Sequence, residues 1–261
     1  MIIQRIAQAL RSQDWVTVTV EFFLVVLGVL VALEVDRYNE RQKERAEELA
    51  FLAALQRDLQ TDIVEYQLIL DGFQAVEEFG LRGVGTLEAD GCEETTCWRR
   101  LLELFHASQW LNASVRRETY EEMKLAGLPT SSALKAEIDR YYDIVGQQSV
   151  LTTELPAYRE FVRSMIPPKV QQYIWTECFS VDGRFESYSV NCASPISESR
   201  ARSIIEQLQG EEQVKRALTF WISNLTLVKI TLPQRNEAAN EALDAVANEL
   251  ADENFHHVRE Q

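Results

Sequence analysis

The residues best suited to metal binding or nucleophilic chemistry in this sequence are four cysteines and three histidines. The cysteines form two local pairs, Cys92 with Cys97 in DGCEETTCW and Cys178 with Cys192 in ECFSVDGRFESYSVNC. Neither pair has the C-x-x-C spacing common in zinc sites, whereas an even number of cysteines in short loops suits disulfides in an oxidising compartment. We therefore expect two disulfides, with a zinc site as the alternative.

The histidines give little support to a catalytic set of nucleophile, histidine and acid. His106 lies in the apolar stretch LELFHASQW, which favours a core histidine over a catalytic base, and His256 and His257 lie near the C-terminus. The run GLRGVG lacks the preceding strand and the lysine of a phosphate-binding loop, so we interpret it as a turn. We expect no enzyme, no catalytic residue, no cofactor and no metal.

Glu21 is the remaining chemical candidate, because it lies inside the apolar run TVTVEFFLVVLGVLVALEVDRYNE. An ionisable residue within a membrane suggests a proton or ion relay. A single span offers no second ionisable residue to continue such a relay. The simpler interpretation is a protonated or hydrogen-bonded Glu21 at a contact with another helix near the headgroups.

The element that carries Glu21 is predicted to be one transmembrane helix over residues 15–35. Its length of roughly 31 Å matches the hydrocarbon thickness of a bilayer. A cleavable signal peptide is the alternative, but ALEVDRYNE has no A-x-A cleavage pattern. Before this helix, residues 1–14 predict a short amphipathic helix on the membrane surface, with a frayed tail as the alternative.

Polar and small residues recur at helical spacing along one side of the predicted transmembrane helix. We call this set the stripe, and it consists of Thr17, Glu21, Leu24, Gly28 and Ala32. Small residues let two helix backbones approach closely, and the larger apolar side chains remain for lipid. The stripe therefore predicts contact with a second copy or with another inner-membrane protein, in addition to the lipid bilayer.

Composition predicts an all-α class for the whole chain, because glycine and proline are scarce among 261 residues. The formal net charge of -15 argues against nucleic acid as a partner. Residues 36–261 are expected to form one helical-bundle domain. The periodic apolar pattern after residue 35 predicts that the membrane helix continues as a stalk to about Phe73.

Shorter elements are expected after a loop that starts near Gly80. Helices are predicted over residues 98–107, from a Ser114 cap through 126, from Ser131 or Ser132 toward 150, and around 158–165 and 170–175. The stretch 179–190 predicts a small hairpin clipped by Cys178 and Cys192. Three further helical segments follow: one capped by Ser197, one that starts at 211 and kinks or ends at Pro233, and an alanine-rich tail over residues 234–250.

Two blocks of the sequence resemble an uncharacterised family of bacterial single-span membrane proteins with a helical outer domain. The first block is EFFLVVLGVLVALEVDRYNERQK, with Glu21, Gly28 and Ala32 at the family's positions and Tyr38 where the family often has Trp. The second is RETYEEMKLAGLPTSSALKAEIDRYYD; its matching residues are Thr119, Tyr120, Glu122, Met123, Gly127, Leu134, Ile138, Tyr141 and Tyr142. The family implies a cytoplasmic N-terminus and a periplasmic domain, although Pro129 departs from its pattern.

The orientation is read from two opposing signals. Lys and Arg are slightly more frequent after the span than before it, which favours a cytoplasmic domain, but this count is unreliable for a long translocated domain. The cysteines and the resemblance favour a periplasmic domain on the bacterial inner membrane, and we adopt that orientation.

Three roles are compatible with this organisation. The first is a structural or interaction protein that self-associates or docks onto a larger inner-membrane complex. The second is a sensor or ligand-binding module, in which Tyr141, Tyr142 and four tryptophans, Trp98, Trp110, Trp175 and Trp221, either line a ligand pocket or fill the core. The third is an ion-coupled, stator-like subunit that uses Glu21. The sequence favours the first role, because about 14 cytosolic residues leave no output domain for a sensor.

Overall fold

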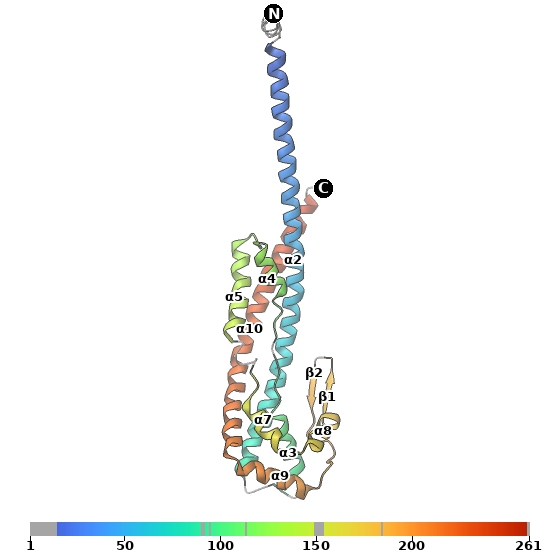
Figure 1. Ribbon diagram of the computed structural model, residues 1–261, viewed down its shortest axis with the longest axis vertical. Helices are drawn as coiled ribbons and strands as arrows, with labels where there is room; N and C mark the ends of the chain where they lie inside the picture. Colours follow the sequence, from blue (N-terminus) through green and yellow to red (C-terminus); the bar gives the residue numbers. More distant parts are fainter. Residues whose placement is uncertain are drawn as a thin grey trace, which may run out of the picture. The chain divides into compact units, whose positions relative to one another are not determined.

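The computed structural model describes residues 15–89, 92–93, 95–112, 114–148, 154–183 and 185–259 (Figure 1). The chain divides into two compact units, Met1–Leu52 and Ala53–Gln261. The described chain is mostly helical, which confirms the all-α class predicted from composition. The amphipathic helix predicted over residues 1–14 lies outside the described residues.

The first unit contains the beginning of helix α2 (Trp15–Glu88). The helix runs past residue 35 without a break, as predicted. Every large apolar side chain described between Val20 and Val35 is exposed, and Phe23 retains 65% of its accessible surface. Charged residues follow, and Arg41 donates to Glu34 across 3.1 Å.

Within the part of the chain that the structure describes, no helix is both long enough and apolar enough to cross a membrane. The structure therefore confirms a helix over the predicted span and does not support its membrane crossing. The crossing stays a prediction from the sequence.

The second unit is a helical bundle with a small hairpin (Figure 1). After α2 come α3 (Cys97–His106), α4 (Glu118–Leu125), α5 (Ser132–Gln148), α7 (Ala157–Met165), α8 (Pro168–Glu177), α9 (Glu198–Gly210) and α10 (Glu212–Arg259). Helix α10 packs against α5, α7 and α9, and α3 packs against α9. The core between α2, α3 and α10 includes Phe73, Leu101 and Leu218, none of which is exposed.

The glycines near residue 80 pack helices together instead of ending one. A loop was predicted from Gly80, but α2 continues to Glu88. A Cβ atom at Gly80 would lie 2.9 Å from Ile222 Cγ1, and one at Gly83 would lie 3.1 Å from Leu104 Cδ2. The missing side chains therefore let α10 and α3 approach α2 closely, and this tertiary packing overrides the low helix propensity of glycine.

One predicted helix boundary is wrong, and one of two outcomes predicted at Pro233 is excluded. Helix α4 starts at Glu118 instead of after Ser114, because the preceding segment carries Arg116 onto carboxylates of α2. A helix end or a kink was predicted at Pro233, and the end does not occur, because helix α10 passes through the proline. Buried residues on both sides of the proline, Leu232 and Ala238 among them, hold this helix in the bundle. The Ser197 cap is confirmed, since its side chain accepts from the Arg200 amide at 3.3 Å.

Both predicted disulfides form, Cys92 with Cys97 and Cys178 with Cys192, so these cysteines are not zinc ligands. The second disulfide closes the predicted hairpin, whose strands are β1 (Phe179–Asp182) and β2 (Phe185–Tyr188). Gly183 has a φ of +63° at the turn, a conformation that glycine adopts without steric cost. The hairpin is also tied to α3, because the Trp98 indole donates to the Cys192 carbonyl at 3.1 Å.

Candidate functional site

The stripe is only partly within the described side chains. Leu24, Gly28 and Ala32 lie on an exposed part of α2, while the side chains of Thr17 and Glu21 lie outside the described set. A Cβ atom added at Gly28 would meet nothing within 4 Å. This part of the helix surface is therefore open to a second helix.

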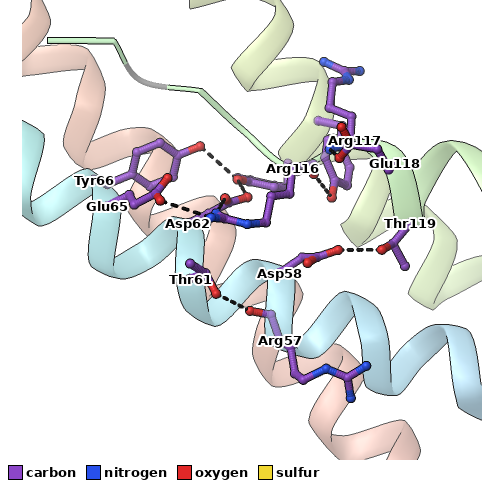
Figure 2. Close-up of polar contacts among 12 residues, drawn as sticks. Arg57, Asp58, Thr61, Asp62, Glu65, Tyr66, Arg116, Arg117, Glu118 and Thr119 are labelled. Carbon is purple, nitrogen blue, oxygen red and sulfur yellow. Dashed lines mark hydrogen bonds and ion pairs between the residues drawn. The ribbon is translucent and has the colours of Figure 1, made fainter. Parts of the chain in front are cut away.

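A second candidate site is a polar cluster inside the bundle that the sequence did not predict (Figure 2). Asp62 of α2 is its centre, with a side chain that is not exposed at all. Arg116 donates to Asp62 Oδ1 and to Glu65 Oε1, each at 3.1 Å. On the opposite side, the Tyr141 hydroxyl donates to Asp62 Oδ2 at 2.9 Å. The cluster therefore joins α2, the segment before α4, and α5.

The cluster extends through a second tyrosine. The hydroxyls of Tyr66 and Tyr141 are 2.8 Å apart. Because the Tyr141 proton is used on Asp62, the Tyr66 hydroxyl donates to Tyr141. This chain of bonds satisfies three buried polar groups at once, so it aligns α2 and α5 in one register.

Burial changes the acidity of the groups in the cluster. It raises the pKa of Asp62 to about 6, although Tyr141 and Arg116 act in the opposite direction by bonding to the carboxylate. Burial also raises the pKa of Tyr66 and Tyr141 well above the usual range, so both hydroxyls keep their protons. Asp62 is thus the group of the cluster that titrates near neutral pH.

The second block of the family resemblance lies around this cluster. Thr119 donates to Asp58 Oδ2 at 2.5 Å, one helical turn before Asp62 (Figure 2). Tyr120 and Tyr142 stack with ring centroids 3.9 Å apart. These quoted motif residues therefore secure α4 and α5 to α2, which is a structural role.

A signal for this cluster is present in the sequence. The buried face of α2 includes Leu55, Leu59, Tyr66 and Phe73, and Asp62 falls in the same register, seven residues after Leu55. An acid in an apolar register indicates a buried charge that needs a partner.

His106 lies in the core, with no exposed surface. Its Nε2 is 3.2 Å from the Ser189 carbonyl oxygen, while its Nδ1 has no hydrogen-bond partner among the described residues. Burial lowers the pKa of His106 to about 4, so the ring is neutral at physiological pH. The neutral His106 ring packs between Phe79 and Tyr188, on the side of the bundle where the hairpin lies.

Four of the six aromatic residues for which a pocket and a core position were both considered lie in the core. Tyr141, Tyr142, Trp98 and Trp221 are at most 5% exposed. The Trp221 indole donates to the Ala107 carbonyl at 2.9 Å and packs edge-on against Phe73. These side chains join α2, α3, α5 and α10 and leave the ligand pocket expected among them without support.

Comparison with known proteins gives one similarity. Residues 21–79 match a family of unknown function, DUF6090, and this stretch lies entirely within α2. The match includes Glu21 and Gly28 of the stripe together with Asp62 of the buried cluster. No curated protein and no solved structure matches the chain. The similarity agrees with the predicted resemblance to an uncharacterised family and assigns no activity.

Proposed function

We propose that this chain is a membrane-anchored helical interaction protein. It self-associates, or docks onto a larger inner-membrane complex, through the stripe and the adjoining stalk. The single observation that supports this role is the exposed apolar surface of α2 from Val20 to Val35. Soluble monomers rarely leave a continuous apolar surface of this kind in water, so a lipid or protein environment must cover it.

The sequence of this region favours lipid as the main cover. Residues 15–35 form an apolar stretch of the length that a bilayer needs. Gly28 and Ala32 are four residues apart, so they give one side of the helix a surface on which a second helix backbone fits closely. Lipid on most sides and protein on the stripe together account for the whole apolar surface.

The two disulfides support a periplasmic location for residues 36–261, since disulfides persist in oxidising compartments. The N-terminus is then cytoplasmic. The acidic net charge of -15 suits a soluble outer domain that does not bind nucleic acid.

Replacing Gly28 with leucine tests self-association through the stripe. A large side chain there separates the two backbones, so the dissociation constant of the assembly is expected to rise at least about tenfold, or about 1.4 kcal/mol. Crosslinking and native mass measurement of the full chain in detergent give the fraction assembled.

Val26→Leu is the matched control, because it enlarges a residue of the lipid-facing side of the same helix. It is expected to assemble like the natural chain. If Gly28→Leu also assembles as the natural chain does, the stripe is not the contact surface.

A further inference from the structure

A cavity of about 350 Å³ lies in the second unit between α2 and the clipped hairpin. Figure 1 shows the hairpin beside the C-terminal part of α2. Helix α2 supplies residues from Leu68 to Phe79, β2 supplies Glu186 to Tyr188, and Leu111 completes the wall. Cavities that bind small molecules start at about 300 Å³, so this one has room for a small ligand.

The inner wall of the cavity is apolar and aromatic. Ile69 and Phe79 are buried, and Ala75 and Leu111 are half-buried. The rings of Phe79 and Tyr188 meet edge to face, with centroids 6.3 Å apart. A ligand at this wall would bury an apolar body against two aromatic rings.

The outer wall is acidic. Asp71 and Glu186 both line the cavity, and neither has an ion-pair partner within the described ranges. Asp71 accepts a hydrogen bond from the neutral Gln67 amide at 2.9 Å. Glu186 accepts one from the Tyr188 hydroxyl. Two carboxylates that make no ion pair therefore lie beside an apolar cavity, and Arg159 interacts with Glu186 only at longer range.

The nearby arginines are used elsewhere. Arg82 lies over the Phe79 ring, 5.0 Å from its centroid, and bonds to the buried Glu103 at 2.9 Å. Arg159 influences Glu186 electrostatically but donates to the Ser108 carbonyl at 3.1 Å. Neither arginine lines the cavity.

Two features hold the walls in place. A Cβ atom at Gly72 would lie 2.6 Å from Leu111 Cδ1, so glycine at this position lets Leu111 lie directly against α2. On the other side, the Cys178 to Cys192 disulfide closes the hairpin that carries Glu186 and Tyr188. The backbone segments that carry the cavity walls are therefore held together before a ligand arrives, which lowers the cost of binding.

We propose that this cavity binds a small organic cation, an amine with a compact apolar or aromatic body. The ammonium group would lie between Asp71 and Glu186, and its body would lie against Phe79 and Tyr188. The carboxylates attract the charge, and the aromatic wall offers an apolar surface to the body of the ligand. This site is independent of the stripe and goes beyond the proposed interaction role.

Titration calorimetry of the purified full chain tests the proposal with three probes of one shape: benzylamine, benzyl alcohol and benzoate. Benzylamine is expected to bind at least about tenfold more tightly than benzyl alcohol, because only the amine is cationic at neutral pH. Benzoate is expected not to bind measurably. Equal affinity for amine and alcohol, or no binding of benzylamine, overturns the proposal without any need for a variant.

Variants then locate the site. Asp71→Asn and Glu186→Gln are each expected to weaken benzylamine binding about tenfold and to leave benzyl alcohol unchanged. Ala75→Leu is expected to fill the cavity and abolish binding of both probes. Glu206→Gln is the control, because it removes the same charge from an exposed position on α9 that does not line the cavity. This variant is expected to bind benzylamine with the affinity of the natural chain. If the Asp71→Asn, Glu186→Gln double variant binds benzylamine as tightly as the natural chain does, the binding site lies elsewhere and the proposal is overturned.

Discussion

Replacing Arg116 with methionine is expected to lower the free energy of unfolding by about 3 kcal/mol at pH 8. The reason is Asp62, whose side chain is not exposed and which bonds to Arg116 at 3.1 Å. Removing the guanidinium leaves a buried carboxylate without its cation. We place the loss at the low end for buried pairs because Arg116 itself is 32% exposed.

The loss is expected to shrink as the pH falls. The folded-state pKa of Asp62 is raised to about 6 from an ordinary value of 3.8, so the folded state binds a proton more tightly than the unfolded state does. The contribution of Asp62 to stability is therefore fully present below about pH 4 and is lost as the pH rises through about 6. A protonated Asp62 no longer needs Arg116, so Arg116→Met is expected to resemble the natural chain more closely at pH 5 than at pH 8.

Urea unfolding of both chains at the two pH values measures this effect. Arg117→Met is the matched control, since Arg117 is 43% exposed and pairs with Glu121 at the surface. Its loss is expected to stay below about 1 kcal/mol at either pH. A deficit for Arg116→Met that is the same at pH 5 and pH 8 would show that the buried carboxylate is not its cause.

Replacing Trp221 with alanine is expected to cost about 4 kcal/mol of stability. Trp221 is 2% exposed, packs edge-on against Phe73 of α2, and donates to the Ala107 carbonyl after α3. Truncation leaves a large cavity where three segments meet and also leaves that carbonyl without its donor. Thermal or urea unfolding followed by circular dichroism measures the loss.

The adjacent Phe220 gives the control, because it is 69% exposed on the same helix. Phe220→Ala is expected to change stability by less than about 0.5 kcal/mol. Trp221→Phe should fall between the two, since it keeps the ring packing and loses the indole bond. Similar losses for Trp221→Ala and Phe220→Ala would mean that Trp221 is not at the centre of the packing.

Much of the fold could be predicted because it follows from local patterns. The periodic leucines before Phe73 predict the continuous helix, and the paired cysteines with an aromatic strand-like stretch predict the clipped hairpin. The Ser197 cap is likewise a local signal. Each of these features depends on residues close together in the sequence.

The errors come from contacts between distant residues. Glycine is typical of a helix end, but at Gly80 the missing side chain leaves room for Ile222 to pack against α2. Pro233 predicts a kink or a helix end, and the end does not occur because the bundle holds the helix on both sides of the proline. The partners of Asp62 are 54 and 79 residues away, so the spacing of residues on α2 alone could not identify them.

The site predictions divide in the same way. The stripe was defined by helical spacing, and it stays a prediction, because the described side chains of this part of α2 are exposed on all sides. The cavity beside the hairpin combines residues 68–79, 111 and 186–188, and only the folded chain brings these three segments together. For the six aromatic residues, the sequence left both a ligand pocket and the core open, because burial cannot be read from residue type alone.

The most direct test of the membrane anchor is the accessibility of single cysteines introduced into α2. All four natural cysteines are in disulfides, so a membrane-impermeant maleimide reports only the introduced residue. The variants are Leu30→Cys, inside the predicted span, and Glu40→Cys, beyond it, each in unsealed membrane fragments that are open on both faces. The anchor predicts rapid labelling at position 40 and none at position 30 until detergent is added. Equal labelling of both positions before detergent is added, or recovery of the chain in the soluble fraction, would contradict it.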